Sequence, residues 1–136
     1  MTLFVDTSVW SLALRRDVPA TAPQVEALRR ALLEGREIIT TGIVLQELLQ
    51  GFAGLNAREQ IIEQFAALPI INPDRNDHIK AAELRNQCRR NGVQLGTIDA
   101  LLAQLCVHHG LQMLTADEDF VRAAHHVPLK LWLPGA

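Results

Sequence analysis

The chain has 136 residues, a length that predicts a single domain spanning residues 1–136 with one substantial core. Apolar residues make up 49% of it and charged residues 21%, which excludes a disordered chain, while the net charge of −2 neither indicates nor excludes a nucleic-acid partner. No apolar run approaches the ~20 residues of a membrane-spanning helix, and the first residues do not form a signal peptide, so we expect a cytoplasmic protein without membrane association.

Strands and helical segments alternate along the chain. Short β-rich runs predict strands at residues 2–5, 37–40, 111–114 and 129–132. Helical periodicity predicts helices at residues 9–14, 23–34, 42–52, 56–68, 74–90, 97–109 and 119–124. Thr41 caps the third of these helices, Asn56 and Glu59 form a capping box for the fourth, and Gly110 closes the sixth. Strands separated by helices predict an α/β fold in which a parallel sheet is covered by helices on both faces.

Two aspartates follow predicted strands. Asp6 ends the first strand, and Asp117 lies three residues after the strand 111–114. Ligands of open parallel sheets bind beyond the carboxyl ends of the strands, so both side chains are expected in one crevice. The alternative is that each is an ordinary turn or N-cap residue.

Two further acids come from helices. Asp99 lies on the helical face of Leu102, Ala103 and Cys106, and Gln104 falls on roughly the opposite side. Glu47 lies at the edge of the apolar face of its helix. As alternatives, Asp99 interacts only with the helix dipole and Glu47 is a surface acid.

A divalent cation would offset the cost of burying these carboxylates, because no lysine or arginine lies near them on the two helices. Mg²⁺ and Mn²⁺ prefer such oxygen ligands. Cys88 and Cys106 are isolated thiols without zinc-site spacing. The histidines also lack metal-ligand spacing, and His108 is expected to interact with the C-terminal dipole of its helix.

Four segments carry a resemblance that covers nearly the whole chain. They are F-V-D-T-S-V-W at the start, E-L-L after a strand and helix cap, G-T-I-D-A-L-L-A, and L-T-A-D-E-D-F near the end. In this order and spacing they resemble PIN-domain ribonucleases of the VapC toxin type. The resemblance implies a PIN-like three-layer α/β/α fold and a Mg²⁺- or Mn²⁺-dependent endoribonuclease, the toxin of a bacterial type II toxin–antitoxin pair. It also implies a homodimer that a small VapB-like antitoxin inhibits.

Carried over by motif, the resemblance implies a set of catalytic and metal-binding acids. They are Asp6, Glu47, Asp99 and Asp117. Asp119 could share or replace the last role, although we favour a plain helix cap for it. The resemblance also places supporting hydroxyls at Thr7 or Ser8 and at Thr115, which could equally be caps. Glu47 is either a metal ligand or the base that orients water.

Substrate contacts are less constrained by the sequence. Arg15 and Arg16 follow the first motif, and Arg85, Arg89 and Arg90 lie on the long helix 74–90; either group could hold RNA phosphates or only solvate its helix.

Two other functions stay open at this stage. One is a different Mg²⁺-dependent phosphoryl-transfer enzyme, such as a small phosphatase, although Ser8 stands where such enzymes place a second acid. The other is a non-catalytic α/β module that binds RNA or a protein.

Overall fold

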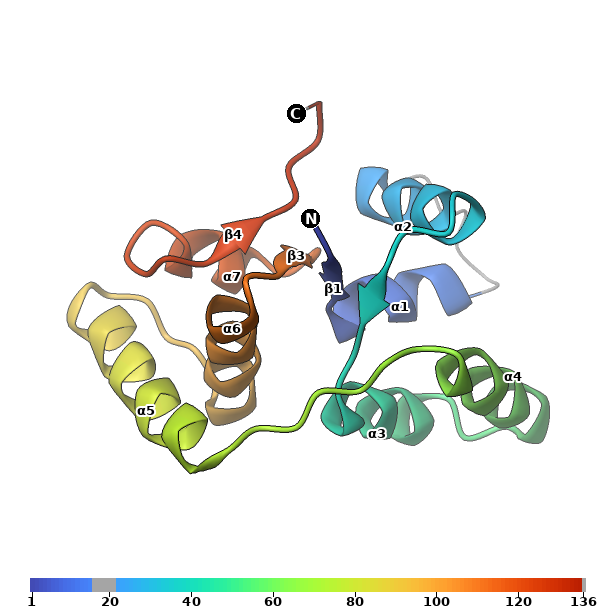
Figure 1. Ribbon diagram of the computed structural model, residues 1–136, viewed down its shortest axis with the longest axis horizontal. Coiled ribbons are helices and arrows are strands. Elements are labelled where there is room, and N and C mark those ends of the chain that lie inside the picture. The colour runs from blue at the N-terminus through green and yellow to red at the C-terminus, as the bar shows by residue number, and fades with distance from the viewer. Residues whose placement is uncertain (16–21, 136) are drawn as a thin grey trace.

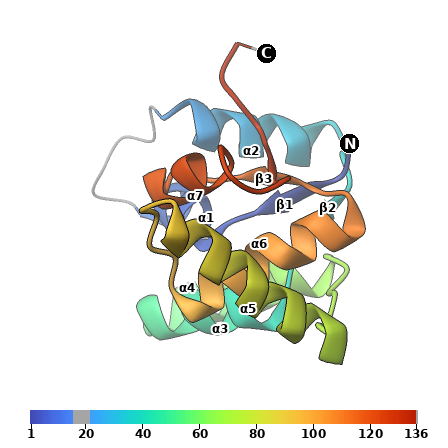
Figure 2. The ribbon, with the colours of Figure 1, turned by 90° about the vertical axis from the view of Figure 1, so that its left-hand side faces the viewer.

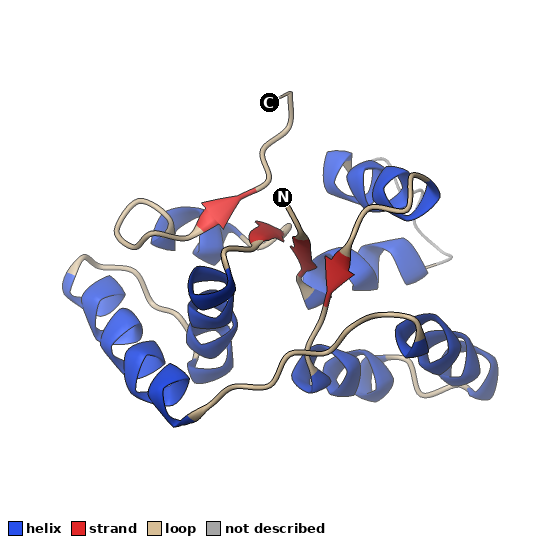
Figure 3. Ribbon diagram, in the orientation of Figure 1, coloured by secondary structure: helices blue, strands red, loops and turns tan. Residues whose placement is uncertain are grey.

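The structure is a computed structural model of the chain, and it describes residues 1–15 and 22–135. The strands are β1 (Leu3–Val5), β2 (Ile38–Ile39), β3 (Gln112–Leu114) and β4 (Lys130–Leu131). The helices are α1 (Thr7–Leu14), α2 (Pro23–Leu33), α3 (Gly42–Gly51), α4 (Leu55–Ala66), α5 (Arg75–Arg90), α6 (Thr97–His109) and α7 (Glu118–Ala123). Helices dominate the molecule and the strands are short (Figure 3). Among the described residues, no helix is both long enough and apolar enough to traverse a bilayer.

The strands form one parallel sheet in the order β2-β1-β3-β4. The chain leaves β1 toward β2 on one side and later returns to β3 on the other side of β1. Because all the strands run in the same direction, the carboxyl ends of β1 and β3 meet at one edge of the sheet. The topology therefore brings together the residues that follow Val5 and Leu114.

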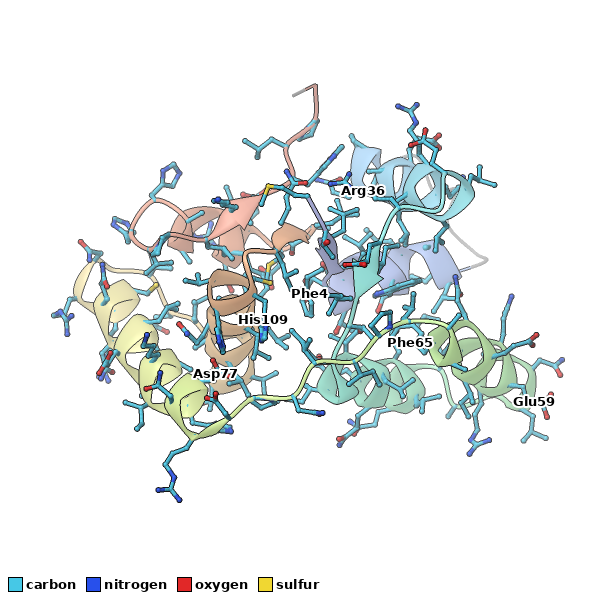
Figure 4. All side chains as sticks on the ribbon, viewed as in Figure 1. Phe4, Arg36, Glu59, Phe65, Asp77 and His109 are labelled. Carbon is cyan, nitrogen blue, oxygen red and sulfur yellow. The ribbon has the colours of Figure 1, made fainter. Side chains whose placement is uncertain are left out.

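Helices cover both faces of the sheet, as predicted. Figures 1 and 2 show α2 on one side of the strands and α3, α4, α5 and α6 on the other. Phe4, at the centre of the molecule in Figure 4, is fully buried together with its strand neighbours. Trp10 of α1 packs against Phe65 of α4, with ring centroids 4.9 Å apart. The result is a three-layer α/β/α arrangement around one central core.

The predicted start of α4 was wrong. The helix begins at Leu55, its N-cap is Gly54, and no side chain caps it. Asn56 and Glu59 lie inside the helix and are exposed. Residues three apart on a helix share one side, so their spacing fits a solvent-facing side of the helix as well as a capping box. The capping box of the structure opens α5 instead.

Candidate active site

Asp6 connects β1 to α1 and is held by two hydroxyls. Its backbone N–H donates to the carbonyl of Leu114, which fixes it against the end of β3, and the residue is only 5% exposed. Ser8 Oγ donates to Asp6 Oδ2 at 2.7 Å, and Thr115 Oγ1 donates to the same oxygen at 2.9 Å. Within residues 1–15 and 22–135, no hydrogen bond reaches Oδ1 of Asp6.

The same hydroxyls organise the loop between β3 and α7. Ser8 Oγ accepts from the backbone N–H of Ala116, and Thr115 Oγ1 accepts from that of Asp117, both at 3.0 Å. Each hydroxyl therefore has its acceptor side occupied and its proton directed at Asp6. Neither hydroxyl caps α1; both connect Asp6 to the loop between β3 and α7.

Asp117 follows β3 as expected and also has the N-cap role that was its alternative interpretation, whereas Asp119 does not cap the helix. Asp117 is the N-cap of α7, and its Oδ1 accepts from the backbone N–H of Asp119 at 2.9 Å. The prediction that Asp119 is the cap was wrong, because the helix starts one residue earlier. Asp119 instead pairs with Arg122 at 2.6 Å on the surface of α7.

Glu47 enters the site from α3. Its Oε1 accepts from Thr7 Oγ1 at 2.8 Å, although the two residues lie 40 positions apart in the sequence. The side chain is half-buried, so Glu47 is not the freely solvated surface acid of the alternative interpretation. Thr7 thus joins the start of α1 to the middle of α3.

Asp99, in the first turn of α6, lies within the field of all these acids. Burial and, to a smaller extent, four neighbouring carboxylates together raise its pKa from the ordinary value of 3.8 to about 6. In order of effect these neighbours are Asp6, Asp117, Glu47 and Asp119. Asp6 also acts with burial to raise the pKa of the Cys106 thiol. The acids from β1, α3, α6 and the β3–α7 loop therefore surround one region.

Among residues 1–15 and 22–135, no cation pairs with Asp6, Glu47, Asp99 or Asp117. In the part of the chain that the structure describes, the ion pairs are Asp119 with Arg122 and Asp77 with His108. None of Asp6, Glu47, Asp99 and Asp117 takes part in either. Crowded carboxylates with only oxygen ligands to offer are the donor set that a hard divalent cation prefers.

A second polar group lies elsewhere, between α5 and α6. It consists of Asp74, Asp77 and His108, whose possible metal-ligand atoms all lie within 4.8 Å of one another. Among the described residues, the acids around Asp99 do not form such a group. Figure 4 shows Asp77 in the space between the two helices. Asp74 and Asp77 form the capping box of α5, and His108 Nδ1 lies 2.7 Å from Asp77 Oδ1.

This group joins the two helices. Burial alone would raise the pKa of Asp77, but the backbone N–H of Asp74 and the contact with His108 outweigh it, so the pKa lies below its ordinary value. The sequence carries no sign of this contact, because 31 residues separate the partners and only helix packing aligns them.

Two arginines follow the first motif, and the structure describes one of them. Arg15 is the exposed C-cap residue of α1. Arg16 lies outside the described residues.

Comparison with known proteins agrees with this architecture. Residues 3–126 match the model of the PIN domain family. The fold is similar to that of VapBC2 from Rickettsia felis bound to a promoter DNA fragment, with a TM-score of 0.72, 20% identity, and coverage of 97% of this chain and 98% of that chain. It is similar to that of VapBC-1 from nontypeable Haemophilus influenzae, with a TM-score of 0.73, 17% identity, and coverage of 97% of each chain. It is also similar to that of Mycobacterium tuberculosis VapC20, a Sarcin-Ricin loop cleaving toxin, with a TM-score of 0.66, 20% identity, and coverage of 92% of this chain and 96% of that chain. No curated protein matches significantly by sequence. The family match spans nearly the whole chain and the fold agrees with it, so this chain belongs to the PIN domain family.

Proposed function

We propose that this chain is a single-domain, metal-dependent endoribonuclease that acts as the toxin of a toxin–antitoxin pair. The observation that carries the proposal is the set of acids at the carboxyl edge of the sheet that form no ion pair with any described residue, where the pKa of Asp99 rises to about 6. Membership of the PIN domain family and similarity to VapC structures support the same activity.

The acids that would hold Mg²⁺ or Mn²⁺ are Asp6, Asp99 and Asp117, with Glu47 as a fourth ligand or as the base that orients water. A bound Mg²⁺ keeps several waters and touches only one or two carboxylates directly, so these acids need not all converge within ligand distance of one another. Such an ion lowers the pKa of a bound water and stabilises charge on a phosphodiester.

The neighbouring hydroxyls position these acids. Ser8 and Thr115 both occupy Oδ2 of Asp6, which leaves Oδ1 available to a cation. Thr7 holds one oxygen of Glu47, so the carboxylate is oriented whether it binds the ion or accepts a proton from the attacking water. Attack of the water on phosphorus, in line with the departing 3′ oxygen of the ribose, would leave a 5′-phosphate and a 3′-hydroxyl.

A phosphatase mechanism is less consistent with the site. Ser8, at the position where a second acid would be needed, donates its proton to Asp6 and is already committed to it.

The proposed partner is a VapB-like antitoxin. The structures whose fold this chain shares include VapBC2, VapBC-1 and the toxin VapC20, and we infer from them that this chain also pairs with a VapB-like protein. A largely apolar pocket of about 730 Å³ lies between the end of α1 and the start of α4, with Leu14, Phe52 and Ile61 in its wall. An apolar antitoxin segment would fit there. We also propose that the protein forms a homodimer and acts in the cytoplasm.

RNA cleavage by the purified chain tests the proposal. We expect cleavage with Mg²⁺ or Mn²⁺, none in EDTA, and at least about a hundredfold loss in Asp6→Asn, because one charge-stabilising ligand is removed. Glu26→Gln, which alters an exposed acid of α2, is the matched control and should keep full activity. Cleavage that persists in EDTA, or an active Asp6→Asn variant, would overturn the proposal.

A further inference from the structure

A basic pocket of about 220 Å³ lies beside the candidate active site. It is formed by the C-terminal half of α5 and the segment that leads into α6, and its lining residues are Arg85, Arg89, Val93, Gln94 and Leu95. Arg85 and Arg89 are four residues apart and therefore share one face of α5. Arg90, which the sequence grouped with them, does not line the pocket.

The two guanidinium groups have unused donors. Arg85 is half-buried, and its Nε donates to the carbonyl of Leu95 at 2.8 Å. Across residues 1–15 and 22–135, its Nη groups make no hydrogen bond, and the guanidinium of Arg89 makes neither a hydrogen bond nor an ion pair. Favourable contact with the helix dipole accounts for arginines in the last turn of α5, such as Arg89 and Arg90, but not for Arg85 one turn earlier.

The pocket adjoins the acids through a short backbone segment. Leu95, which Arg85 holds, is followed by Gly96, the N-cap of α6. A Cβ atom at Gly96 would lie 4.0 Å from Asp99 Oδ2, so this backbone separates the arginines from the acidic region. In Figure 2 the C-terminal end of α5 lies on the same side of the molecule as α1 and α7.

We propose that the pocket of Arg85 and Arg89 binds a backbone phosphate of the RNA strand, next to the bond that is cleaved. This inference rests on the proposed function. The clustered carboxylates of the active site repel the negatively charged RNA backbone. A cationic contact with a neighbouring phosphate offsets part of this repulsion and so favours RNA binding. Arginine suits this role because its planar donor fork can hold two phosphate oxygens while Nε remains bonded to Leu95.

RNA binding in EDTA, measured with a labelled single-stranded RNA by fluorescence anisotropy over a range of salt concentrations, tests the pocket without cleavage. Arg89→Gln is the decisive variant because it removes a guanidinium that forms no hydrogen bond or ion pair with any described residue. We expect its Kd to rise about three- to tenfold and the slope of log Kd against log salt to fall by about 0.7. Arg75→Gln, at the other end of α5, is the matched control and should bind as the wild type does.

Cleavage assays separate this inference from the proposed function. With Mg²⁺, Arg89→Gln should raise KM for a long RNA and leave kcat unchanged, and it should not alter cleavage of a dinucleotide too short to reach the pocket. Wild-type affinity and salt slope in Arg89→Gln would overturn the pocket while RNA cleavage still supported the nuclease. A wild type that binds RNA through Arg89 but never cleaves it would support the pocket and overturn the nuclease. Arg89-dependent binding of a glutamate-rich peptide, without RNA binding, would overturn the pocket in favour of a protein partner.

Discussion

Replacing Asp99 by asparagine should stabilise the metal-free protein at neutral pH. The folded state raises the pKa of Asp99 from 3.8 to about 6 through burial and repulsion by the other acids, so it disfavours the charged form. Between these two values the folded state binds more protons than the unfolded state, so stability falls as the pH rises through this window and the penalty is complete above it.

The size of this effect follows from the shift. A rise from 3.8 to about 6 corresponds to at most about 3 kcal/mol. Asp99 is half-buried, and solvent screening reduces this to about 1.5 kcal/mol. Asparagine also loses the interaction of a carboxylate with the N-terminal end of α6, about 0.5 kcal/mol. The net stabilisation should be about 1 kcal/mol, which raises Tm by roughly 3–5 °C in a chain of this size.

Thermal unfolding in EDTA at pH 7.5 and again at pH 4 measures this difference. The Tm gap between Asp99→Asn and the wild type should be present at pH 7.5 and small at pH 4, where the wild-type carboxyl is largely protonated. Glu26→Gln, an exposed acid in the first turn of α2, should show no such gap. Added Mg²⁺ should stabilise the wild type more than the variant, because the variant lacks a ligand. An Asp99→Asn variant that is less stable than the wild type at both pH values would refute the crowding of acids.

Two further predictions concern residues around the site. Asp117→Asn should lower RNA cleavage at least about tenfold in the Mg²⁺ assay, whereas Asp119→Asn should retain most activity, because Asp119 is neutralised by Arg122; the reverse order would exchange their roles. His108→Gln should cost about 1–2 kcal/mol of stability at pH 6 in urea unfolding, because it removes a bond to a buried carboxylate. Since the pKa of Asp77 is lowered in the fold, its stabilisation is present above its ordinary pKa of 3.8 and is lost as the pH falls below it. Equal unfolding midpoints for His108→Gln and the wild type would show that the bond contributes nothing.

The residues at strand ends could be predicted from the sequence because their positions follow from chain order. A parallel sheet places the residues after β1 and β3 at one edge, so Asp6 and Asp117 were expected together before any contact was known. The hydroxyls, at Thr7 or Ser8 and at Thr115, were expected there only because of the resemblance to the PIN-domain ribonucleases.

The helical acids depended on weaker reasoning. Gln104 was expected opposite the apolar face of α6, but it is buried, because α5 packs over that face and leaves residues 101–106 without a solvated side. Periodicity alone therefore did not establish the position of Asp99. The packing of α3, α6 and the sheet sets its position near the other acids, and the raised pKa of Asp99 is the consequence.

Contacts between distant helices could not be predicted. Thr7 with Glu47, and Asp77 with His108, join residues 40 and 31 positions apart. Their pairing depends on the register between packed helices, which neither local propensity nor spacing encodes. The capping box predicted at Asn56 and Glu59 failed for a different reason. A local pattern exists there, but it fits a helix interior as well as a helix start.

The most direct test of the account is a calorimetric titration of Mn²⁺ into the metal-free chain. The wild type should bind Mn²⁺ at the acids around Asp99, and Asp6→Asn should weaken this binding at least about tenfold. His108→Gln should leave it unchanged, which separates this site from the group between α5 and α6. Binding that is equally tight in Asp6→Asn, or that disappears only in His108→Gln, would contradict the claim that a divalent cation compensates the crowded acids.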